Sequence, residues 1–216
     1  MKLYSILFLA ALALFSCKKE IEESNSTSFE QPSTKDYLIT TAGSYWVYDN
    51  YKVDGNGVET SLNTLDTIKC LGTEVIEGKE YAVFYRSFNP YFNLYLRDSN
   101  GYVIDQHGKV NFSMNKVGEV FSSREISGLI NEEVKVASVD QDLSTQAGAF
   151  ETVHIEAKYS YLDGTTFNAC GGQSVALNTY YTKGVGKVWM EYGYIVELEN
   201  TCSYRVRKLK EYSIAK

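Results

Sequence analysis

The sequence predicts an all-β fold, a single antiparallel β domain built as a sandwich or as a strongly curved sheet or half-barrel. The 216 residues include 18 tyrosines and 10 phenylalanines but only 2 prolines, and flat aromatic rings suit half-buried sheet positions. Short runs rich in aromatic and β-branched residues recur along the chain with turn signals between them. Beyond the N-terminal segment, no stretch has the i, i+3, i+4 apolar stripe with caps that indicates a helix.

The expected strands follow one another from residue 37 onward. The first, residues 45–53, reads YWVYDNYKV and is ended by the turn residues Asp54-Gly-Asn-Gly57. The strongest hairpin signal is Asn100-Gly101, which separates the runs 91–97 and 102–106. The remaining expected strands are residues 65–76, 80–88, 132–139, 149–161, 174–182, 187–192 and 204–212. Together they predict one β domain over residues 37–216.

Residues 1–16 predict a signal peptide. Lys2 supplies a positive start, and an apolar core follows from Leu3 to Phe15. At about 1.5 Å per helical residue this core would extend roughly 20 Å, well short of the ~30 Å needed to span a bilayer. The segment therefore indicates export rather than a stable membrane span.

The end of this segment, Leu14-Phe15-Ser16-Cys17, resembles the lipobox of bacterial lipoproteins, although Phe15 is bulkier than the usual residue. The resemblance implies cleavage before Cys17, lipidation of its sulfur and acylation of its new amino group. Several acyl chains on one residue anchor a protein stably. Residues 17–36 are charged and rich in serine and threonine, which is typical of a flexible tether.

The resemblance also implies a lipid anchor in the outer membrane. The acids Glu20, Glu22 and Glu23 resemble the export patch that sends Bacteroidetes lipoproteins to the cell surface, but Lys18 and Lys19 interrupt them. The sequence leaves open whether the protein faces the periplasm or the exterior, and whether this segment sorts it at all.

Two further patterns resemble uncharacterised Bacteroidetes-type lipoproteins whose body is a curved antiparallel sheet. The first is Gly43, Trp46 and Tyr48 in an early strand. The second is a late stretch with Tyr181, Gly184-Val185-Gly186 and Val188. The resemblance implies the fold but no biochemical activity, because that group has none in common.

The glycine-rich stretch at 180–189 also suggests a phosphate-binding loop, but its details do not fit one. The P-loop pattern would need a glycine at Tyr181 and a hydroxyl residue at Val188, and the dinucleotide pattern would need a glycine at Trp189. A strand-like run follows where a helix is required. We therefore expect no nucleotide, and we expect Gly184 and Gly186 to form a turn or bulge between two strands.

No catalytic set, cofactor or metal site is predicted. His107 and His154 lie far apart in the sequence without the partners of a triad or a zinc site, and Asp54 with Asn56 is explained by turn chemistry. A net charge of −6 without a basic stripe argues against nucleic acid. We expect no enzyme activity, although a carboxylate pair of a hydrolase would depend on the fold.

Three cysteines follow Cys17 in the sequence, which is an odd number. An exported protein enters an oxidising compartment, where cysteines form disulfides. Cys170 and Cys202 flank the expected hairpin at 180–192, so we predict a disulfide between them and a buried thiol at Cys70. Closing this loop would contribute about 3 kcal/mol in the chain-entropy model. The alternative is that all three are free.

The sequence thus favours a lipid-anchored envelope protein whose β domain binds a ligand or protein partner without catalysis. One alternative is a surface glycan-binding protein, in which Trp46 and Trp189 would stack on sugar rings. Another is a carrier that holds a hydrophobic ligand in a cavity of the curved sheet. Against the glycan role stands the simpler interpretation that both tryptophans pack in the core or across strands.

Overall fold

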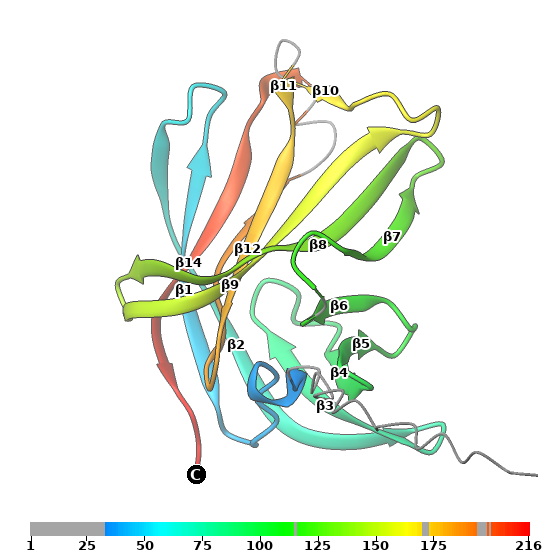
Figure 1. Ribbon diagram of the computed structural model, residues 1–216. Helices are drawn as coiled ribbons and strands as arrows, with labels where there is room; N and C mark the ends of the chain where they lie inside the picture. The colour runs from blue at the N-terminus through cyan, green and yellow to red at the C-terminus, as the bar shows by residue number, and fades with distance from the viewer. Residues whose placement is uncertain (1–32, 115, 170–172, 194–197, 199) are drawn as a thin grey trace, which may run out of the picture. The chain divides into compact units, whose positions relative to one another are not determined.

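The computed structural model of the protein describes residues 33–114, 116–169, 173–193, 198 and 200–216. Within these residues the main feature is one antiparallel sheet of 12 strands that curls into a nearly closed barrel (Figure 1). The predicted all-β class and single β domain are confirmed. Of the two predicted architectures, the curved sheet is the one observed.

The strand bounds agree best with the prediction where aromatic and β-branched residues are dense. The strands are β1 (Tyr45–Val53), β2 (Glu59–Ile76), β3 (Lys79–Arg86), β4 (Leu94–Ser99), β5 (Tyr102–Asp105), β6 (Val110–Ser113), β7 (Val120–Ile126), β8 (Ile130–Thr145), β9 (Gly148–Tyr161), β10 (Asn168–Ala169), β11 (Gln173–Ser174), β12 (Ala176–Thr182), β13 (Gly186–Tyr192) and β14 (Tyr204–Ser213). Strand β1 has the predicted bounds. Strands β6 and β7 were not predicted, because one is very short and the other is largely polar.

The sheet order is β6-β5-β4-β3-β2-β1-β14-β13-β12-β9-β8-β7, with β10 and β11 in a separate pair. Strand β1 therefore pairs with β14, from the other end of the described chain, and the β12–β13 hairpin lies between β14 and β9. Long strands β2 and β8 extend past the predicted ends because their outer parts are exposed and polar, without an apolar alternation to reveal them.

The predicted hairpin at Asn100-Gly101 is present between β4 and β5. Both turn residues have positive φ, 53° and 82°, as a two-residue turn of this kind requires. The loop after β1 also follows its sequence chemistry. The Asp54 carboxylate accepts hydrogen bonds of 2.9 Å from the backbone N–H groups of Asn56 and Val58.

Packing of the domain begins slightly before the expected boundary at Tyr37. A short 3-10 helix, η1 (Thr34–Asp36), follows Ser33, which caps it. Thr34 is fully buried and hydrogen-bonds to Asp98 at the end of β4. Residues 34–36, expected in the tether, therefore pack with the sheet because their polar groups find partners there.

Apolar side chains of the described residues form the core in three clusters, and two of these contain residues of β1 and β5. One gathers around Trp46, Tyr48 and Leu209 on neighbouring strands β1 and β14. The other joins side chains of β5 and β6, such as Val103 and Phe112, to Val136, Val153 and Ile155 on β8 and β9. Since β5 and β8 are far apart in the sheet order, this second cluster packs opposite walls of the barrel together. Among the described residues, no helix is both long and apolar enough to span a membrane.

Candidate functional site

The two sequence patterns that carried the family resemblance meet inside the barrel. The indole Nε1 of Trp46 donates a buried hydrogen bond of 2.7 Å to the carbonyl of Val185. The Tyr48 hydroxyl donates one of 3.0 Å to the carbonyl of Lys187. These bonds tie β1 to the Gly-Val-Gly turn, which lies about 140 residues later in the chain.

The Gly-Val-Gly stretch is a hairpin turn, as predicted. Gly184 and Gly186 have φ of 75° and 93°, which favour glycine, and β13 begins directly at Gly186. The pairing of β12 with β13 shifts next to this turn, where Tyr181 lies opposite Lys187 but Tyr180 lies opposite Trp189. Val188 is the extra residue of this bulge, so Lys187 and Trp189 point to opposite faces of the sheet.

The last residue of η1 packs against the same turn. The backbone N–H of Gly184 donates to the Asp36 carbonyl at 2.8 Å, and Lys183 forms an ion pair with the Asp36 carboxylate at 2.8 Å. From there Tyr37, Leu38 and Ile39 continue along the interior of the barrel. The residues next to the expected tether thus form part of the interior wall.

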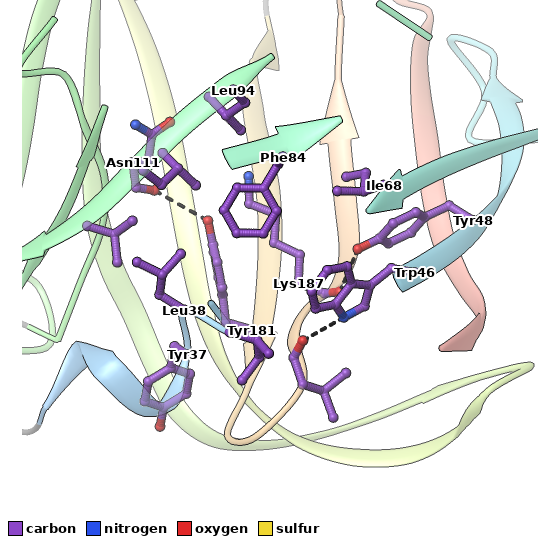
Figure 2. Close-up of a pocket in the computed structure, with 14 residues that line it drawn as sticks. Tyr37, Leu38, Trp46, Tyr48, Ile68, Phe84, Leu94, Asn111, Tyr181 and Lys187 are labelled. Carbon is purple, nitrogen blue, oxygen red and sulfur yellow. Dashed lines mark hydrogen bonds between the residues drawn. The ribbon is translucent and has the colours of Figure 1, made fainter. Parts of the chain in front are cut away.

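This wall and the strands around it line a partly open cavity of about 100 Å³ (Figure 2). Its lining is mainly apolar and aromatic. It also includes the charged residue Lys187 and the polar residue Asn111. The lining residues are Tyr37, Leu38, Ile39, Trp46, Tyr48, Ile68, Phe84, Leu94, Leu96, Val103, Asn111, Tyr181, Val185 and Lys187. Figure 2 shows Tyr181 reaching toward Asn111, where its hydroxyl donates a bond of 3.4 Å to the Asn111 carbonyl.

Lys187 is the charged side chain of the cavity, and its environment disfavours the charge. Burial lowers the pKa of its ammonium to about 8, and the positive charges of Lys109, Arg207 and Arg86 add to this effect. Burial also raises the pKa of the neighbouring phenols Tyr48 and Tyr181, so both stay protonated. The cavity therefore holds one titratable cation and neutral aromatic neighbours.

Polar and charged side chains of the interior lie near Lys187. Asp66 on β2 and Arg207 on β14 form an ion pair of 2.5 Å, and both are largely buried. The Arg207 guanidinium lies over the Phe88 ring, 3.7 Å from its centroid. Burial and the charge of Arg207 lower the pKa of Arg86, whose Nε has no hydrogen-bond partner among the described residues. This region carries more positive than negative charge.

The two tryptophans predicted to stack on glycans lie in different places. Trp46 is only 5% exposed and lines the cavity, so it presents no ring to an external sugar. Trp189 lies on the opposite face of the sheet in a row across four strands with His154, Tyr180 and Lys208. Tyr180 stacks on His154 at 4.6 Å, and the Lys208 ammonium lies 4.3 Å from the Trp189 ring. Much of this aromatic surface is thus in contact with other side chains of the protein, which leaves less of it for a sugar ring.

The remaining sequence candidates acquire structural roles or lie outside the described residues. The His154 ring bonds to the Asn178 side chain at 2.7 Å, and His107 lies in the β5–β6 turn. No cluster of three potential metal ligands occurs among the described residues.

The predicted lipidation site and disulfide cannot be followed in full. Cys17 and Cys170 lie outside the described residues, so lipidation and the Cys170–Cys202 disulfide stay predictions. Of the two described cysteines, Cys70 is a free thiol and is buried, as expected. Cys202 is not a free thiol.

Sequence reasoning did not find Lys187 as a site residue. The prediction placed this lysine in a stretch that lacks the glycines and hydroxyl of a phosphate loop, and the structure has strand β13 where such a loop would need a helix. A lysine at the start of a strand normally points to solvent, so the signal was weak. The bulge at Val188 turns it inward, and a one-residue shift in register leaves no trace in composition.

Comparison with known proteins finds similar solved structures but no family. No protein-family model and no curated protein matches this sequence. One similar solved structure is described as an exported protein with a YmcC-like fold from Bacteroides fragilis NCTC 9343. Its identity is 12% and its TM-score 0.46, over 82% of this chain and 98% of that one. Another is described as a lipoprotein from Parabacteroides distasonis ATCC 8503, with 13% identity, a TM-score of 0.43 and the same coverage. At these TM-scores neither carries an argument about the site.

Proposed function

We propose that this chain is a lipid-anchored envelope protein whose β domain binds a small ligand in the barrel interior without catalysis. The lipobox-like sequence ending at Cys17 supports the anchor. The observation that carries the binding function is the cavity of about 100 Å³, in which apolar walls surround the ammonium of Lys187. Apolar pockets with a few placed polar groups are typical ligand sites.

The size of the cavity selects among ligands. An engineered cavity of ~150 Å³ accepts benzene, so this one accepts a body of about four carbon atoms. A carrier of a long acyl chain would need several hundred Å³. The carrier hypothesis is therefore narrowed to small ligands. Glycan binding would use the row around Trp189, and it ranks second because the ring faces there are largely occupied.

The binding function can be measured with n-butanol as a neutral probe. The chain has two tryptophans, so Trp189→Phe leaves Trp46 as a reporter in the cavity wall. We expect n-butanol to change Trp46 emission in a saturable way. Leu96→Phe should abolish this change because the larger ring fills the cavity, at a stability cost of about 1–3 kcal/mol.

A matched control is Leu129→Phe, at a position that is 67% exposed in the turn before β8. This variant should bind n-butanol like its parent. If n-butanol leaves Trp46 emission unchanged in the folded Trp189→Phe protein, the interior is not a ligand site. That result decides the question even if Leu96→Phe fails to fold.

A further inference from the structure

Among the described residues the ammonium of Lys187 has no counter-charge, and it lies over the Tyr181 ring, 5.5 Å from the ring centroid. None of the ion pairs in the described part of the chain involves Lys187, although Lys208 and Lys210 on β14 each have a carboxylate partner. The walls around it are leucine, isoleucine, valine and aromatic rings. A charge placed in such surroundings is unfavourable unless something else in the cavity pairs with it.

The groups that face Lys187 from neighbouring strands do not supply this partner. Asp66 is the interior carboxylate nearest in the sheet register, directly opposite Tyr48, but it is bound to Arg207 at 2.5 Å. The charged groups that act on the pKa of Lys187 are all cations: Lys109 in the β5–β6 turn, Arg86 on β3 and Arg207 on β14. The charges that act on Lys187 are thus positive, in a chain whose net charge is −6.

We propose that the cavity binds a small organic monocarboxylate, with the carboxylate at Lys187 and a short hydrocarbon body against the apolar wall. This inference rests on the proposed interior site and specifies its ligand. A monocarboxylate matches the one ammonium that lines the cavity, whereas phosphate prefers several donors such as arginine forks or backbone N–H groups. A body of about four carbons matches the volume.

Binding of this kind is linked to protonation. The carboxylate pairs with the charged form of Lys187, whose pKa in the empty cavity is about 8. Below pH 8 the ammonium is already formed, and above pH 8 binding must take up a proton. Affinity should therefore fall as the pH rises through 8, and binding at pH 8.5 should be accompanied by proton uptake.

The test uses sodium butyrate and n-butanol, which share a four-carbon body, on the full-length Trp189→Phe protein. At pH 6.5 we expect butyrate to bind at least about tenfold more tightly than n-butanol, as measured by Trp46 emission. At pH 9.5, where butyrate is still ionised but Lys187 is largely neutral, its affinity should drop about tenfold or more. The affinity of n-butanol should not change.

Two lysine variants provide the matched comparison, because Lys183 and Lys187 flank the same turn. Lys187→Met should abolish the preference for butyrate and retain n-butanol binding. Lys183→Met, in which an exposed lysine is lost, should bind both probes like its parent.

Each outcome has a distinct meaning. Equal binding of butyrate and n-butanol at pH 6.5, or an unchanged preference in Lys187→Met, overturns the carboxylate inference and leaves the interior site intact. Absence of binding by both probes overturns the interior site itself. The inference also requires proton uptake when butyrate binds at pH 8.5. Calorimetry in buffers of different ionisation enthalpy measures this uptake, and its absence overturns the carboxylate inference.

Discussion

Lys187 is the residue in which structure and predicted function are most closely connected. Its carbonyl accepts the Tyr48 hydroxyl bond that holds β13 to β1, while its side chain faces the cavity. The backbone of this residue therefore serves the fold, and its ammonium, which lies over the Tyr181 ring, has no carboxylate partner among the described residues. Fixing the backbone in this way sets the direction in which the side chain leaves the strand, without using its charge.

Replacing Lys187 by methionine should stabilise the empty protein. The pKa of this lysine falls from 10.5 to about 8 on folding, so the unfolded chain binds more protons between these values. Stability should therefore rise as pH increases from about 8 to 10.5 and be constant below 8. At pH 7 we expect Lys187→Met to gain on the order of 1–3 kcal/mol, and to lose the rise above pH 8.

Urea denaturation at pH 7, 8, 9 and 10 measures both effects. Lys183→Met is the control, because its lysine is exposed and its variant should keep the rise in stability above pH 8. A Lys187→Met protein that is less stable at pH 7, or that retains the pH dependence of its parent, would show that the Lys187 ammonium is not desolvated.

At the scale of elements, the β12–β13 hairpin organises the interior. Its turn receives Trp46 from β1 on one side and the Asp36 carbonyl from the N-terminal segment on the other. The glycine at 186 has a second requirement besides positive φ. A Cβ atom there would lie 3.3 Å from the Tyr37 carbonyl oxygen, whereas one at Gly184 would meet no atom within 4 Å.

The two glycines should therefore respond differently to alanine. Gly184→Ala should cost about 1 kcal/mol through its positive φ alone. Gly186→Ala should cost about 1–2 kcal/mol more, because the N-terminal segment must also move. Thermal or urea unfolding of both variants measures the difference. Equal losses would indicate that residues 36–37 do not press against the turn in solution.

At the scale of the whole molecule, curvature of the sheet creates the site. Because β5 and β6 approach β8 and β9 across the interior, their side chains close the cavity that β1, β12 and β13 begin. The N-terminal segment completes the wall directly after the expected tether. If residues 17–36 connect the barrel to a lipid at Cys17, that connection is followed directly by Tyr37, Leu38 and Ile39, which line the cavity.

The anchor is tested by substitution of Cys17. In cells fed a labelled fatty acid, we expect Cys17→Ala to abolish incorporation of label and to release the protein from the membrane fraction. Cys70→Ala is a suitable control because this thiol is buried in the barrel, so labelling should persist. Continued labelling of the Cys17→Ala protein would contradict the lipobox interpretation. The Cys17→Ala protein should still bind n-butanol, since its barrel is intact.

Much of the fold could be read from local chemistry. Strand β1, the Asn100-Gly101 hairpin and the Gly184–Gly186 turn each depend on the residues that form them, so short stretches of sequence predicted them. Strands β6 and β7 were not predicted, because one is very short and the other is largely polar. Their residues form strands through pairing with β5 and β8. The site was harder, because Trp46 was predicted as a surface aromatic or core residue without any sign that it lines a cavity.

By itself, the sequence determined the class of fold, the position of the turns and the expected export signal and anchor. These follow from periodicity, turn residues and a short motif, all of which are local. Only the tertiary structure decided that Trp46 meets the Gly-Val-Gly turn, that Lys187 points inward and that no carboxylate of the described residues pairs with it. Each depends on strand register and on contacts between residues far apart in the chain, and a single bulge at Val188 sets which face a side chain takes.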